Sequence, residues 1–192
     1  MASPLVCASC GALNPLPPDA LDHFELFGVE RGYDIDQELL HRKYLALSRS
    51  IHPDVASQQS EEIRQRALVL SSELNRAYDT LQSPVSRAEY LLSLAGGPAA
   101  ANDKSVPPEL LGEVVMLREA IEEARGSGDM GELERIRQRV SAGQQAALEA
   151  IARLCRSLKP GAIKEQKDLR IQLNAVKYWN NLLEQLPTGA SV

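Results

Sequence analysis

The tripeptide His52-Pro53-Asp54 puts an imidazole and a carboxylate on either side of a proline. Proline has no amide hydrogen and disfavours the helical conformation of the residue before it, so we expect the preceding helix to end near Ile51. His52 and Asp54 then project from a turn, and the small or polar residues at 56–60 continue it as a solvated loop that can contact another molecule. Catalysis by His52 is the alternative chemistry, but no serine, cysteine or carboxylate lies at a spacing that builds a nucleophile and base around it.

The helix expected before this tripeptide is locally basic. No acidic residue occurs between Leu39 and Pro53, whereas Arg42, Lys43 and Arg49 all do. The whole chain has a formal net charge of −5, so this positive stretch favours an acidic partner surface. An ordinary helix stop with a solvated basic face is the competing interpretation.

Cys7 and Cys10 have the spacing of half a zinc site, because two thiolates separated by two residues can share one tetrahedral ion. No second pair of this kind exists, so a complete site would need His23, another chain or a partner. An unpaired or redox-labile leader is the alternative. Cys155 lies among apolar residues at helical spacing and is expected in the core. We therefore predict no required cofactor and leave zinc at Cys7 and Cys10 open.

Composition excludes several classes of function. The three cysteines are too few for a disulfide scaffold, which indicates a reducing, cytoplasmic setting. With 21 basic and 26 acidic side chains, the chain is not expected to bind nucleic acid. The apolar runs are shorter than the roughly 20 residues of a membrane span, so no membrane partner is expected. Because no glycine-rich phosphate loop or pair of catalytic carboxylates is apparent, we predict that the protein is not an enzyme.

Apolar residues recur at helical spacing through most of the chain, and no strand-like alternation is long enough to matter. The fold class is therefore all-α. The predicted segments are an irregular leader at 1–20, a domain with a helical hairpin at 21–96, a linker at 97–106 and a three-helix bundle at 107–188. The stripes of the hairpin are Leu40, Tyr44, Leu47 and Ile51 in the first helix and Ile63, Ala67, Leu70, Leu74, Ala77 and Leu81 in the second.

The first helix of the bundle, from Pro108 to Ala124, is predicted to have two apolar faces. The core stripe comprises Leu110, Val114, Leu117 and Ile121. The second face comprises Leu111, Val115 and Met116, with Glu119 and Glu123 continuing it at i+4 spacing. A helix in a small bundle rarely needs both faces for its own core, so the second face predicts a docking surface. A single wide core face is the alternative.

The hairpin, the tripeptide and the nearby residues Asn75, Ala77 and Tyr78 together resemble a J-domain. Two further stretches, DHFELFGVERGYDID (Asp22 to Asp36) and SPVSRAEYLLSLAG (Ser83 to Gly96), resemble the HscB (Jac-type) family of iron–sulfur cluster co-chaperones. The resemblance spans nearly the whole chain from Asp22. It implies an N-terminal J-domain followed by a C-terminal three-helix bundle.

This resemblance implies two protein partners. The positions that would dock on an HscA- or DnaK-type heat-shock chaperone and stimulate its ATPase are His52, Pro53, Asp54, Lys43 and Arg49. The positions that would hold an IscU-type scaffold for iron–sulfur cluster assembly are Leu111, Val115, Met116, Glu119, Glu123 and Tyr178. Met116 and Gly112 depart from the family, whose members carry an acid and a larger apolar residue there. The Cys7–Cys10 stretch resembles the second of two such pairs found in some family members.

Two other functions stay open. A metal-binding enzyme using Cys7, Cys10 and His52 would bind stoichiometric metal that is needed for turnover. A passive helical adaptor would bind its partner whatever residue replaced Asp54.

Overall fold

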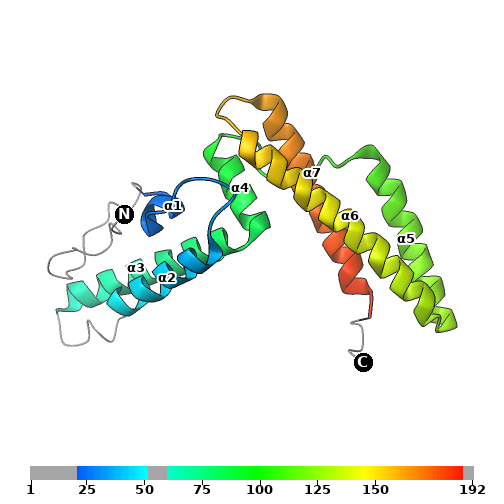
Figure 1. The fold of residues 1–192 in the computed structure, drawn as a ribbon, viewed down its shortest axis with the longest axis horizontal. Coiled ribbons are helices and arrows are strands. Elements are labelled where there is room, and N and C mark those ends of the chain that lie inside the picture. The colour runs from blue at the N-terminus through cyan, green and yellow to red at the C-terminus, as the bar shows by residue number, and fades with distance from the viewer. Residues whose placement is uncertain (1–20, 52–59, 188–192) are drawn as a thin grey trace. The chain divides into compact units, whose positions relative to one another are not determined.

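The computed structural model describes residues 21–51 and 60–187. Over these residues the chain forms seven α-helices and no strand (Figure 1). Internal contacts divide the chain into two compact units, Met1–Tyr90 and Leu91–Val192. In the described part of the chain, no helix combines the length and apolar character that a membrane crossing requires. The predicted all-α fold class is confirmed.

The first described helix of the N-terminal unit is α1 (His23–Phe27), a short helix capped at both ends. The Asp22 carboxylate accepts hydrogen bonds from two backbone N–H groups of the first turn, at 2.8 and 2.9 Å. Gly28 ends the helix with φ of 57°, a left-handed conformation that glycine adopts without a Cβ clash. Phe24 and Phe27 are buried and fix the helix to the rest of the unit.

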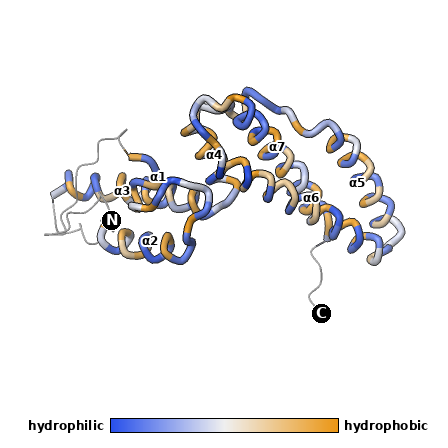
Figure 2. Tube along the Cα trace, turned by 45° about the horizontal axis from the view of Figure 1, so that its top comes forward, coloured by the Kyte–Doolittle hydropathy of each residue, from blue (hydrophilic) through white to orange (hydrophobic). Residues whose placement is uncertain are grey.

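The predicted hairpin is formed by α2 (Gln37–Ile51) and α3 (Glu61–Gln82), which lie side by side in Figures 1 and 2. Stripe residues that are buried as predicted are Leu40, Ile51, Ala67, Leu70, Leu74, Ala77 and Leu81, whereas Tyr44, Leu47 and Ile63 are half-buried. The Tyr44 ring stacks on that of Tyr78 with centroids 4.1 Å apart. Ser71 Oγ donates to the Ile51 carbonyl at 3.1 Å, so α3 holds the last described turn of α2.

A buried arginine ties α4 (Pro84–Leu94) to the N-terminal unit. Arg87 donates from Nε to the Leu81 carbonyl at 2.8 Å and from Nη1 to the Tyr33 carbonyl. Its guanidinium also lies 5.3 Å from the centroid of the Tyr33 ring, a cation–π distance. The arginine of the stretch SRAEYLLSL therefore joins the end of α3 to the connection between α1 and α2.

The C-terminal unit is a bundle of α5 (Pro108–Ser127), α6 (Met130–Ser157) and α7 (Ile163–Gln185). Pro108 begins α5, where proline fits the first turn, and Gly128 ends the helix in the left-handed region. Figure 2 shows hydrophobic and hydrophilic residues alternating along each helix, the pattern of helices that bury one face. Cys155 is buried, which confirms its predicted core position.

Trp179 of α7 is buried in the bundle. It approaches α6 at Gly143, where an added Cβ would lie 2.6–2.8 Å from three atoms of the indole ring. The ring and the helix can come this close because glycine has no side chain.

Three buried polar side chains on α7 hold the segment 95–105, which follows α4. They are Gln166, Arg170 and Asn174, spaced by four residues. Their hydrogen bonds run to the carbonyl groups of Ala95 (2.8 Å), Pro98 (2.9 Å), and Asp103 and Ser105 (2.9 Å each). Most of the predicted linker is thereby bound to α7 within the C-terminal unit.

Candidate protein-interaction surfaces

The basic residues predicted on α2 fall into two kinds. Arg42 and Arg49 are exposed. Lys43 is half-buried, and its Nζ donates to the carbonyl groups of Phe27 at 2.8 Å and Gly28 at 3.0 Å. An ammonium at the C-terminus of a helix satisfies carbonyls that have no partner within that helix. Lys43 therefore caps α1, a role that the sequence analysis missed because no local pattern shows which carbonyls a lysine reaches.

Several predicted site residues lie outside the described residues. These are His52, Pro53 and Asp54 of the tripeptide, and Cys7 and Cys10 of the N-terminal pair. The docking role of the tripeptide and zinc binding by the two cysteines both stay predictions. Among the residues that are described, no group of three or more His, Cys, Asp or Glu side chains could hold a metal ion.

His23, considered above as an additional zinc ligand, is packed against Tyr90. The two rings are stacked with centroids 4.2 Å apart, and the His23 backbone N–H donates to the Tyr90 hydroxyl at 3.0 Å. Burial lowers the pKa of the His23 imidazole, and the positive charge of Arg76 lowers it further. The folded unit therefore favours the neutral ring.

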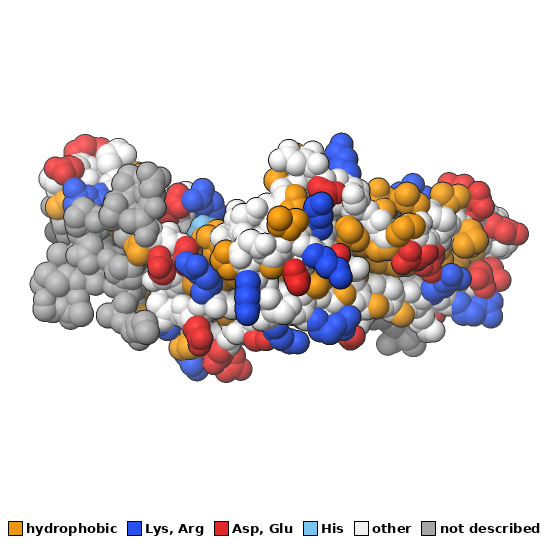
Figure 3. All heavy atoms as spheres, turned by 90° about the horizontal axis from the view of Figure 1, so that it is seen from above, with side chains coloured by type: hydrophobic (Ala, Val, Ile, Leu, Met, Phe, Trp, Pro, Cys, Tyr) orange, Lys and Arg blue, Asp and Glu red, His pale blue; other side chains and the backbone are white. Residues whose placement is uncertain are grey.

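The two predicted faces of α5 are distinct in the structure. The core stripe of Leu110, Val114, Leu117 and Ile121 is buried. The second face is open, with exposed fractions of 50% for Leu111, 55% for Val115 and 59% for Met116. The alternative of a single wide core face is thus wrong for these three residues. In Figure 3, hydrophobic side chains lie among acidic ones in the right-hand part of the view, over the C-terminal unit.

The other residues predicted for this surface are only partly gathered by the fold. Glu119 and Glu123 are exposed on α5, one and two turns beyond Val115, so they extend the apolar face with negative charge. Tyr178 lies on α7 and is half-buried, beside the buried Trp179. The surface therefore offers three apolar side chains followed by two carboxylates on one helix, and a tyrosine on another.

A family profile described as the DnaJ domain matches residues 22–90. A second profile, described as the HSCB C-terminal oligomerisation domain, matches residues 106–187. The iron–sulfur cluster co-chaperone protein HscB of Mus musculus is 30% identical over 181 residues, which cover 94% of this chain and 73% of the mouse protein. The chain belongs to the HscB family.

Other HscB proteins extend the comparison. The iron–sulfur cluster co-chaperone protein HscB homolog of Arabidopsis thaliana is 35% identical over 129 residues, 67% of this chain and 51% of that protein. The crystal structure of the human co-chaperone protein HscB superposes with a TM-score of 0.81 and 25% identity, covering 97% of this chain and 90% of the human one. The resemblance deduced from the residues is therefore confirmed.

Proposed function

We propose that this HscB-family chain is a co-chaperone in iron–sulfur cluster assembly, with no catalytic activity of its own. Its J-domain stimulates the ATPase of an HscA- or DnaK-type chaperone. Its C-terminal bundle binds an IscU-type scaffold protein and presents it to that chaperone. A role in iron–sulfur cluster assembly is supported by the mouse and Arabidopsis relatives, which are named as iron–sulfur cluster co-chaperones. The observation that carries the scaffold role is the exposed apolar face of α5, which is separate from the buried core stripe of the same helix.

The chaperone side of the proposal depends on the hairpin and its loop. α2 presents Arg49 to solvent in its last turn, directly before the His52-Pro53-Asp54 tripeptide. In a desolvated interface, a hydrogen bond to a charged group such as the Asp54 carboxylate contributes about 1.5–3 kcal/mol. One loop residue can therefore control whether the chaperone responds.

Binding of the scaffold protein depends on the exposed apolar area of α5 and on the charge beside it. Leu111, Val115 and Met116 leave half or more of their surface in water, which favours a partner that covers them. Glu119 and Glu123 then favour basic groups at the edge of the partner's apolar surface. Most of the binding energy of an interface comes from a few central residues, and this face has only three apolar ones. We therefore expect a moderate affinity, which suits a partner that must be released after delivery.

The test is ATP hydrolysis by a DnaK-type chaperone in the presence of an IscU-type scaffold protein. Wild-type protein should accelerate hydrolysis, Asp54→Asn should abolish the acceleration, and the exposed-residue control Asp79→Asn should behave as wild type. Leu111→Ala/Val115→Ala should keep the basal J-domain stimulation and lose the additional stimulation that the scaffold provides. Full stimulation by a folded Asp54→Asn protein would favour the passive adaptor instead.

A further inference from the structure

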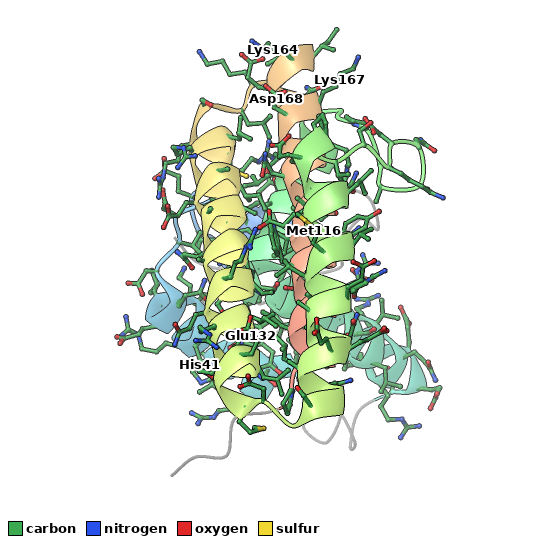
Figure 4. The ribbon with its side chains drawn as sticks, turned by 90° about the vertical axis from the view of Figure 1, so that its right-hand side faces the viewer. His41, Met116, Glu132, Lys164, Lys167 and Asp168 are labelled. Atoms are coloured by element: carbon green, nitrogen blue, oxygen red, sulfur yellow. The ribbon has the colours of Figure 1, made fainter. Side chains whose placement is uncertain are left out.

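A groove with a volume of about 400 Å³ opens between α5 and α6, beside the proposed scaffold surface. Its lining residues are Met116, Leu117 and Ala120 from α5 and Glu132, Arg135, Ile136 and Arg139 from α6. Figure 4 shows Met116 projecting from α5 toward α6, with Glu132 lower down on the α6 side. Met116 therefore belongs both to the exposed face of α5 and to the wall of this groove.

The groove has an apolar floor and a polar rim. Leu117 and Ile136 are buried and form the floor, and the small side chain of Ala120 leaves the space above them open. Arg135 is paired with Glu132 at 2.8 Å, so its charge is held at the rim.

The second arginine of the rim is also held in place. Arg139 donates from Nε and Nη2 to Glu113 Oε1 of α5 at 3.0 and 2.9 Å. This ion pair bridges the two helices beside the groove. Because both arginines are paired with carboxylates, the rim of the groove has little net charge. The apolar floor therefore favours an apolar group of the partner.

From this continuity and this lining, we infer that the scaffold-binding surface extends around α5 into the groove, which receives an aliphatic side chain of the scaffold protein. The inference rests on the proposed scaffold binding and adds α6 to a surface assigned so far to α5 and α7. The volume is near the lower end of the roughly 300–1,000 Å³ typical of ligand-binding clefts, which suits a few partner atoms better than a whole cofactor. Methionine fits this position because its unbranched thioether adapts to the shape of an inserted group.

Filling the groove tests the inference without altering the α5 residues already assigned to scaffold binding. Ala120→Leu adds volume in the middle of the groove and keeps a strong helix former in α5. Its matched control is Ala150→Leu, which fills a different groove of about 380 Å³ between α6 and α7. Both alanines are half-buried in the wild-type chain. Ala120→Val is the second, smaller filling variant and keeps the test valid if leucine disturbs the fold.

The affinity of each full-length variant for an IscU-type scaffold protein is measured by titration calorimetry. Thermal unfolding followed by circular dichroism shows in parallel whether each variant is folded. Ala120→Leu should weaken binding at least tenfold and Ala120→Val less, while Ala150→Leu binds as wild type. Wild-type affinity in both Ala120 variants, with binding lost in Leu111→Ala/Val115→Ala, overturns the groove inference and leaves the proposed function standing. Wild-type affinity in all of these variants overturns both.

Discussion

Replacing Lys43 by methionine separates two roles for one cation, capping α1 inside the unit and docking on a chaperone. The substitution keeps the aliphatic stem and removes the ammonium that donates to the carbonyls of Phe27 and Gly28, at 2.8 and 3.0 Å. Hydrogen bonds to charged groups contribute about 1.5–3 kcal/mol each when buried, and Lys43 is only half-buried. We expect Lys43→Met to lower the free energy of unfolding by about 2 kcal/mol.

The assay is urea unfolding followed by far-ultraviolet circular dichroism. With an m value of about 2 kcal/mol per molar, a loss of about 2 kcal/mol moves the urea midpoint down by about 1 M. The neighbouring Arg42→Met is the control, because Arg42 is exposed and surface substitutions usually change stability by about 0.5 kcal/mol or less. If Lys43→Met unfolds at the wild-type midpoint but loses ATPase stimulation, Lys43 acts at the docking surface and the capping role is refuted.

Four further substitutions test the packing that positions the surfaces and the stacking of the His23 ring. Gly143→Ala places a Cβ 2.6 Å from the Trp179 ring and should destabilise the bundle by about 1–2 kcal/mol, because overpacking outweighs the gain in helix propensity. In Gly112→Ala the new Cβ meets no atom within 4 Å, so this substitution should instead stabilise the bundle by about 0.8 kcal/mol. Thermal unfolding shows whether the two signs are opposite, and equal shifts would contradict the close approach of α6 to Trp179. Asn174→Leu should cost about 2 kcal/mol in the same experiment, since it leaves the Asp103 and Ser105 carbonyls without these donors. Measuring the free energy of unfolding at several pH values tests the stacked His23 imidazole. The folded-state pKa of His23 lies below the ordinary 6.5, so the stabilisation by the neutral ring is fully present above pH 6.5 and is lost as the pH falls toward the lowered pKa. His23→Phe keeps a ring against Tyr90 and should lose less stability than wild type between pH 7.5 and pH 5.5; identical losses would rule out His23 as the titrating group.

The helices and one of the two candidate surfaces could be predicted from local patterns. Gly28 and Gly128 end their helices, because a left-handed residue after the last turn is a local requirement that glycine meets best. The exposed set of Leu111, Val115 and Met116 was separable from the core stripe because helical periodicity alone puts them on another face.

The remaining features depend on contacts between segments distant in the chain. The donors of Lys43 reach carbonyls 15 and 16 residues away, and Asn174 reaches carbonyls about 70 residues away. The four-residue spacing of Gln166, Arg170 and Asn174 was visible in the sequence. Polar residues at that spacing normally face solvent, however, so the pattern alone gave no reason to bury them. The groove beside Met116 was hidden for a similar reason, since it exists only where α5 packs on α6.

Direct binding of a scaffold protein to the open face of α5 tests the account most closely. Burying the exposed halves of Leu111 and Val115 should contribute about 1.5–3 kcal/mol together, so Leu111→Ala/Val115→Ala should weaken the affinity for an IscU-type scaffold at least about tenfold. Met130→Ala/Ile163→Ala is the matched control in the same unit, because these residues are 63% and 66% exposed but lie on other helices. The account predicts wild-type affinity for the control and the full loss for the α5 pair. Equal affinities for wild type and both double variants, measured by titration calorimetry on folded protein, would contradict it.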